Sequence, residues 1–167
     1  ILSTFFPPLS KESSSVQIEV KGLLIPANEG AIDVSIVMPS LNQVQYIERA
    51  LRSILEQETK FSLEVIVMDG GSTDGSLEIL SRIAIESQGR LHWYSEADRG
   101  PAHAVNKAMA KARGGVIGWL NADDLYTPGA IERAVKAMLE NSEWCMLYGQ
   151  GEHIDACDIF IGDYPTR

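Results

Sequence analysis

Short apolar runs alternate with segments of helical periodicity along most of the chain, and this alternation restricts the fold more than any other sequence feature. The apolar runs lie at residues 34–38, 63–68, 91–94, 116–120 and 145–148. Between them, apolar residues recur every three or four positions, which is typical of amphipathic helices. Strands that alternate with helices form right-handed βαβ units, and these build a mostly parallel sheet covered on both faces. We therefore expect an α/β, Rossmann-like fold.

Four helices are expected between and after these strands. The first covers residues 44–55, and the second follows a glycine-containing turn, with Thr73 or Asp74 as its N-cap. The third covers residues 102–112, and the fourth begins near Pro128, since proline is favoured in the first turn of a helix.

The first 33 residues lack this pattern. They mix prolines with a run of serines and contain one alternating stretch at residues 16–20, which could form a strand. We expect residues 1–33 to be an N-terminal arm or edge segment and residues 34–167 to be one domain, since this length suits a single core. Because the chain starts without Met and stops without a terminating signal, we also expect the domain to be C-terminally incomplete.

The composition excludes several classes of protein. With 14 Lys and Arg against 23 Asp and Glu, the formal net charge is -9, which opposes binding to nucleic acids. No apolar run approaches the roughly 20 residues that cross a bilayer, and two cysteines are too few for a disulfide framework. We expect no nucleic-acid partner, no transmembrane segment and a cytoplasmic location, either free or peripheral at the inner membrane face.

Three polar clusters directly follow three of the expected strands. They are residues 39–42, 69–75 and 121–124. Each cluster alone is also explained by an ordinary helix start, a βα turn or a helix cap. Because the carboxyl ends of parallel strands meet at one edge of the sheet, where ligands of such sheets bind, the three together favour a ligand site.

The adjacent carboxylates Asp123 and Asp124 suggest a divalent cation. Two such groups at a strand end repel each other, and a bound Mg²⁺ or Mn²⁺ relieves this repulsion. The alternative is that they cap the helix beginning near Pro128 and favour its positive dipole end.

Other polar and aromatic side chains have two readings each. Asp69 could accept hydrogen bonds from a base edge or ribose, or satisfy the amides of its own turn. Arg99 and His103 could meet a phosphate at a helix start, or be surface and capping groups. The three tryptophans lie on expected strands and are expected in the core rather than as sugar platforms: Trp93, Trp119 and Trp144.

In four ordered blocks, the sequence resembles the family 2 glycosyltransferases of GT-A fold. The blocks are Val34–Asn42, Asp69–Gly75, Glu96–Gly100 with Asn106 and Lys107, and Trp119–Gly129. The resemblance implies a nucleoside-diphosphate sugar donor, usually with uracil as the base, a divalent metal (Mn²⁺ or Mg²⁺), and a sugar or lipid-linked sugar acceptor. The implied donor-binding residues are Pro39, Ser40, Leu41, Asn42, Asp69, Arg99, Asn121, Ala122 and Asp123, and the implied metal ligands are Asp123 and Asp124.

One residue departs from the family pattern. Asn121 stands where the family often has the first acidic residue of Asp-x-Asp, so donor binding is expected to persist with weaker metal affinity. The resemblance also implies an inverting transfer in cell-surface polysaccharide synthesis, with a carboxylate base beyond the nucleotide-binding half. No residue of this chain matches that base, so we expect the chain to bind donor and transfer sugar poorly.

Three other functions compete with this interpretation. A non-catalytic nucleotide-sugar-binding domain would keep the fold without the chemistry. A nucleotidyltransferase also binds nucleotides at a parallel sheet, although residues 40–43 contain neither glycine nor lysine for a triphosphate loop. A phosphoacceptor receiver domain fits poorly, because Pro39 and Ser40 stand where its acidic pair is expected.

Overall fold

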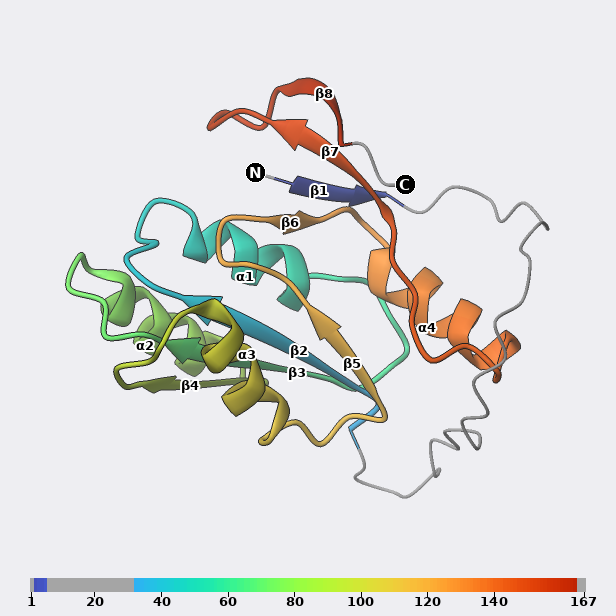
Figure 1. Cartoon of the computed structure of the whole chain (residues 1–167), viewed down its shortest axis with the longest axis horizontal. Coiled ribbons are helices and arrows are strands. Elements are labelled where there is room, and N and C mark those ends of the chain that lie inside the picture. The colour runs from blue at the N-terminus through green and yellow to red at the C-terminus, as the bar shows by residue number, and fades with distance from the viewer. Residues whose placement is uncertain (1, 6–31, 165–167) are drawn as a thin grey trace.

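The computed structural model describes residues 2–5 and 32–164 (Figure 1). Four helices and eight strands lie in these residues. Their order is β1 (Leu2–Phe5), β2 (Val34–Ser40), α1 (Ile47–Leu55), β3 (Leu63–Asp69), α2 (Ser76–Glu86), β4 (Leu91–Ser95), α3 (Pro101–Met109), β5 (Val116–Trp119), β6 (Leu125–Tyr126), α4 (Ala130–Glu140), β7 (Gln150–Ile154) and β8 (Phe160–Tyr164).

The main sheet has the strand order β4-β3-β2-β5, and every neighbouring pair is parallel. This confirms the α/β class and the parallel sheet expected from the sequence. Strand β2 runs two residues further than its apolar run, through Pro39 to Ser40. The last pair that β2 makes with β5 is Val37 with Trp119, so Pro39, which has no N–H, lies beyond that pairing.

Alternating residues of β2 and β3 face two different cores. On one face, Ile36, Met38 and Val65 pack with buried residues of α1, α2 and α4. On the other face, Val37 and Ile66 pack with the small-residue helix α3. The period-two alternation therefore buries both faces of the sheet, as Figure 1 shows for the helices on either side of β2 and β3.

A second sheet lies beside α1, with the strand order β6-β1-β7-β8. Strand β1 pairs parallel with β6 and antiparallel with β7, and β7 pairs antiparallel with β8. The residues 2–5 of the expected arm thus form an inner strand of this sheet. The strand expected at residues 16–20 lies outside the described residues.

The prediction of a strand at residues 145–148 is wrong. These residues are irregular, and the chain forms β7 and β8 after them instead. Met146 and Tyr148 are 76% and 69% exposed, so the apolar run does not mark a buried strand. Apolar composition alone misplaced this element.

Two helix starts also differ from expectation. Helix α1 begins at Ile47 rather than near residue 44. Helix α2 begins at Ser76 with Gly75 at the N-cap, where φ is 101°, a conformation that glycine adopts without strain. Asp74 still serves the helix start, because its Oδ1 accepts a hydrogen bond from the Ser76 N–H at 3.0 Å.

The amino end of the main sheet is closed by a buried glutamate. Glu64 on β3 is 1% exposed, and its carboxylate accepts hydrogen bonds from Ser35 Oγ at 2.6 Å and from the N–H and Nε of Arg113, both at 2.9 Å. The Gly114 N–H donates to Ser35 Oγ at 2.8 Å. A Cβ at Gly114 would lie 2.4 Å from Ser35 N, so only glycine permits this close packing.

Within residues 2–5 and 32–164, no helix is both long enough and apolar enough to cross a membrane.

Candidate functional site

A cleft of about 340 Å³ opens at the carboxyl edge of the main sheet. The end of β2, the loop and first turn of α3, and the segment after β5 supply its walls. The lining residues are Pro39, Ser40, Leu41, Gln43, Asp98, Gly100, Pro101, Ala104, Asn121, Ala122 and Asp123. Six of the predicted site residues therefore meet in one cleft, although the sequence separates them into two clusters.

Ser40, the last residue of β2, has an unpaired hydroxyl. The residue is 6% exposed, and its Oγ has no hydrogen-bond partner among the described residues. Buried polar atoms are paired in the great majority of cases, so an unpaired one needs an explanation. Next to it, Leu41 is 53% exposed and offers an apolar surface to the cleft.

Asp69 and Asn42 lie outside the cleft lining and organise the loop after β3. Asp69 is 1% exposed, and its carboxylate accepts hydrogen bonds from Gly71 N–H at 2.9 Å, Ser72 N–H at 2.8 Å, Ser72 Oγ and Ser95 Oγ. Asn42 Oδ1 accepts from Thr73 N–H at 2.9 Å. The observed contacts of Asp69 are therefore those of a residue that accepts hydrogen bonds from the amides of its own turn. Its contact with a base stays a prediction.

Asp123 and Asp124 have different surroundings. Asp123 is half-buried and lines the cleft, whereas Asp124 is buried and accepts a hydrogen bond from Asn121 Nδ2 at 3.0 Å. Asn121 Oδ1 in turn accepts from Trp119 Nε1 at 3.1 Å. Asp124 therefore orients Asn121, and Asp123 is the carboxylate of this pair that faces the cleft.

In the loop before α3, the predicted site residue Arg99 lies outside the cleft lining, whereas Asp98, which was not predicted as a site residue, lines the cleft. Arg99 is exposed and does not line the cleft, and its backbone N–H donates to His103 Nδ1 at 3.1 Å. Its neighbour Asp98 lines the cleft, with Oδ1 accepting from Gly100 N–H at 2.7 Å. The available sequence signal was an acidic residue between an expected strand and the Gly100-Pro101 helix start.

Trp119 contradicts the expectation that the tryptophans are core residues, because it is 55% exposed. It ends β5, an edge strand whose outer side has no neighbouring strand in the described part of the chain. Trp93, on β4, is partly buried and packs against the larger core, as expected.

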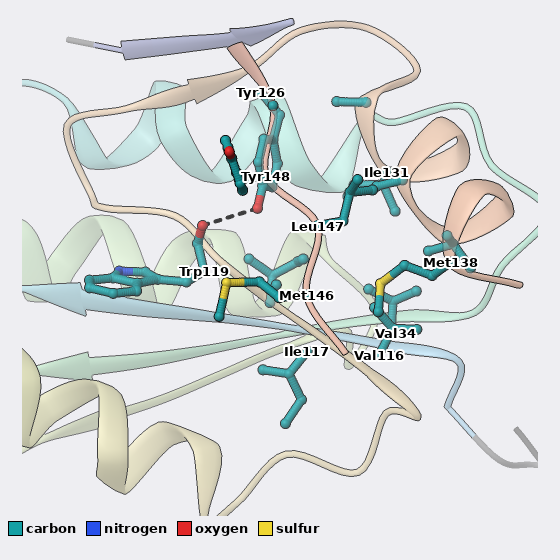
Figure 2. Close-up of a pocket in the computed structure, with 16 residues that line it drawn as sticks. Val34, Val116, Ile117, Trp119, Tyr126, Ile131, Met138, Met146, Leu147 and Tyr148 are labelled. Carbon is teal, nitrogen blue, oxygen red and sulfur yellow. Dashed lines mark hydrogen bonds between the residues drawn. The ribbon is translucent and has the colours of Figure 1, made fainter. Parts of the chain in front are cut away.

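A second cavity, of about 450 Å³, lies between β5, α4 and residues 146–149 (Figure 2). Its walls are mainly aliphatic and aromatic. Tyr126 reaches across it and donates a hydrogen bond to the Trp119 carbonyl at 3.1 Å. Burial raises the pKa of Tyr126 to about 12, so the phenol stays protonated near neutral pH. None of the three polar clusters lines this cavity.

Solved structures with the same fold include two glycosyltransferases. The chain matches S. aureus TarS in complex with UDP-GlcNAc with a TM-score of 0.58 and 25% identity, over 65% of this chain and 32% of that one. It matches the mannosyltransferase PcManGT from Pyrobaculum calidifontis, in complex with GDP-Man and Mn²⁺, with a TM-score of 0.58 and 33% identity. That match covers 63% of this chain and 32% of the other.

Curated relatives include polysaccharide synthases. The chain is 32% identical over 136 residues to the hyaluronan synthase of Pasteurella multocida, and 34% identical over 122 residues to the chondroitin synthase of Escherichia coli. These alignments cover 79% and 73% of this chain but 14% and 18% of the relatives, so the chain spans less than a fifth of their length. The family model described as Glycosyl transferase family 2 matches residues 35–155.

Proposed function

Because the chain belongs to glycosyl transferase family 2 and has the GT-A fold, we propose that it forms the nucleotide-sugar-binding part of a glycosyltransferase. The reaction moves a sugar from a nucleoside-diphosphate donor, with UDP as the preferred nucleotide, to a hydroxyl group of a sugar or lipid-linked sugar acceptor. The names of the relatives, hyaluronan synthase and chondroitin synthase, support a role in cell-surface polysaccharide synthesis. The cytoplasmic location stays a prediction.

The observation that carries this proposal is the buried, unpaired Ser40 hydroxyl in a cleft that also holds Asp98 and Asp123. An unpaired donor, two carboxylates and the exposed Leu41 side chain surround one space at the carboxyl edge of a parallel sheet. That is the edge at which nucleotides bind in such folds. A nucleotide-sized ligand would give Ser40 the partner that residues 2–5 and 32–164 do not provide.

The residues of the cleft suit a hard divalent cation. Asp123 offers a carboxylate and Asn121 an amide oxygen, and Mg²⁺ or Mn²⁺ prefers oxygen ligands, often one or two carboxylates plus substrate phosphates. Asp124 supports this site through its hydrogen bond to Asn121 and is the less direct of the two predicted metal ligands. The mannosyltransferase relative was solved with Mn²⁺.

In the proposed mechanism, the chain's own residues bind and orient the donor. Leu41 packs against the base, Ser40 donates a hydrogen bond to the nucleotide, and Asp123 would hold the cation. When bound, the cation neutralises the charge that develops on the departing diphosphate. We propose an inverting transfer, and we assign the base that deprotonates the acceptor to no residue of this chain.

Calorimetric titration of UDP, with and without Mn²⁺, tests the site. We expect Mn²⁺ to strengthen binding by about tenfold or more in the unaltered chain, and Asp123→Ala to abolish this dependence, because it removes the carboxylate that faces the cleft. Asp163→Ala is the matched control, since Asp163 is an exposed carboxylate on β8 and does not line the cleft.

Two outcomes would contradict the proposal separately. Equal, metal-independent affinity in the unaltered chain and in Asp123→Ala would refute the metal site alone. If the unaltered chain is folded, as judged by cooperative unfolding, and binds neither UDP nor GDP, the proposed nucleotide site is refuted.

A further inference from the structure

Gly70, the first residue after β3, is approached closely by two side chains from other segments. A Cβ built at Gly70 would lie 3.0 Å from Asp98 Oδ2 and 3.5 Å from Leu41 Cδ1. Leu41 comes from the end of β2 and Asp98 from the loop before α3, and both line the cleft. A carboxylate oxygen and an exposed apolar side chain of the cleft lining therefore pack close to Gly70, where a larger side chain would crowd both.

The carboxylate of Asp98 is fixed in this position by one of its oxygens. Oδ1 accepts the Gly100 N–H at 2.7 Å, at the turn where α3 begins. For Oδ2, no hydrogen bond or ion pair is found within residues 2–5 and 32–164. An ionised carboxylate accepts hydrogen bonds and cannot donate them, so Oδ2 remains available as an acceptor for a ligand in the cleft that Asp98 lines.

Asp69 is less suited to contact a ligand, although it lies only one residue from Gly70. Its carboxylate already accepts four hydrogen bonds from Gly71, Ser72 and Ser95, and it is fully buried beneath the loop. A ligand could reach it only by displacing the contacts that shape the loop. Asp98 needs no such rearrangement, because it lines the cleft and its Oδ2 has no hydrogen-bond partner among the described residues.

Resting on the proposed nucleotide-sugar donor, we propose that Asp98 determines base specificity by accepting a hydrogen bond from the edge of the donor's base, which lies against Leu41 in the cleft. We place the contact at the ring nitrogen of this edge, where uracil presents an N3–H donor and guanine an N1–H donor, whereas cytosine presents an N3 acceptor there and donates only through its exocyclic N4 amino group. A carboxylate oxygen attracts the first two and repels the lone pair of the third. Asp98 therefore selects uridine or guanosine diphosphate over cytidine diphosphate.

The test measures the affinities of UDP, GDP and CDP by calorimetry with Mn²⁺ present. We expect the unaltered chain to prefer the better of UDP and GDP over CDP by about tenfold or more. In Asp98→Asn, the preference should fall to within about threefold, because an amide can turn its NH₂ towards cytosine N3. The amide oxygen can still accept the Gly100 N–H, so the loop is retained.

Two further variants separate recognition from structure. Gly70→Ala should weaken UDP or GDP binding without changing CDP binding to the same degree, since the new methyl group crowds Asp98 Oδ2. Glu96→Gln is the control from the same loop, because Glu96 pairs with Lys107 at 3.0 Å and lies outside the cleft lining. It should leave the ratio of affinities unchanged.

The outcomes are distinguishable from those of the proposed function. If UDP or GDP binds and the ratio to CDP is unchanged in Asp98→Asn, or if the unaltered chain prefers CDP, the role of Asp98 is overturned while the nucleotide site stands. If none of the three diphosphates binds to the unaltered chain, the proposed function fails, and this inference fails with it.

Discussion

The buried polar groups at the two ends of the main sheet differ in whether they have hydrogen-bond partners. At the amino end, Glu64 accepts hydrogen bonds from Ser35 and from Arg113, and the turn at Gly114 closes over them. At the carboxyl end, the Ser40 hydroxyl is equally buried and has no partner in the described residues. The first arrangement stabilises the fold, and the second leaves a buried hydroxyl whose hydrogen-bonding capacity no described residue uses.

The charge of Glu64 follows from a competition between burial and hydrogen bonding. Burial alone would raise the pKa of Glu64, but hydrogen bonds from Arg113 and Ser35 and the positive charge of Arg113 outweigh it, so the pKa lies below its ordinary value of 4.5. The buried glutamate is therefore ionised at neutral pH. The ion pair remains connected to solvent through Arg113, whose side chain is largely exposed.

Removing the Glu64 carboxylate from the amino end of the main sheet should lower the stability of the protein more than any other change proposed here. We expect Glu64→Ala to lower the free energy of unfolding by about 3 kcal/mol, because Ser35 Oγ and the Arg113 N–H lose their shared acceptor. Urea denaturation measures this loss. Glu56→Ala is the control, since Glu56 is exposed and its contact with Arg52 is 3.5 Å long. Equal stability of the two variants would show that the network is dispensable.

Acid should remove part of the same stabilisation. A carboxyl group whose pKa is lowered on folding stabilises the protein above its unfolded pKa, and this contribution is lost as the pH falls through the lower folded value. Glu64→Gln keeps the shape and an acceptor but not the charge. We expect it to be less stable than the unaltered chain at pH 7, with the difference narrowing as the pH falls below 4.5. Urea denaturation at several pH values measures it, and a constant difference would contradict the assignment.

The smallest effect on stability is expected at the carboxyl end, where Ser40 is compared with Ser35 at the amino end of the same strand. Ser35→Ala should cost about 1–2 kcal/mol of unfolding free energy, because Ser35 Oγ donates to Glu64 and accepts from Gly114. Ser40→Ala should change stability by less than about 0.5 kcal/mol, or raise it, since none of the described residues forms a hydrogen bond with Ser40 Oγ.

Nucleotide affinity should depend on the two serines in the opposite way: Ser40→Ala should weaken binding more than Ser35→Ala does. In calorimetric titration with UDP and Mn²⁺, Ser40→Ala should bind about threefold to tenfold more weakly, whereas Ser35→Ala should bind as the unaltered chain does. A Ser40→Ala variant that is strongly destabilised and binds UDP normally would remove the contrast between the two ends.

The elements with regular apolar patterns could be predicted from the sequence. Strands β2 to β5 and the helices between them follow from the alternation of apolar runs and helical periods. The run at residues 145–148 was misread, because an exposed apolar segment and a buried strand have the same composition. Trp119 was misplaced for a related reason: the sequence does not give the strand order, and only that order puts β5 at an edge.

The site was predictable where it follows the strand ends. Residues 39–41 and 121–123 meet in one cleft because parallel strands end on the same side. The position of Asp98 over Gly70 could not be read from the sequence, because it depends on how the loop before α3 folds back over the end of β3. The buried environment of Asp69 is likewise a property of the folded loop.

The hydrogen bond between Trp119 and Asn121 couples the fluorescence of Trp119 to a residue that lines the cleft. An exposed indole emits at long wavelength, and its emission depends on the partner of its N–H group. Here that partner is a side chain of the cleft, which is itself oriented by Asp124. A ligand that contacts Asn121 alters the surroundings of this fluorophore, so the chain carries an intrinsic reporter of cleft occupancy at the last residue of β5.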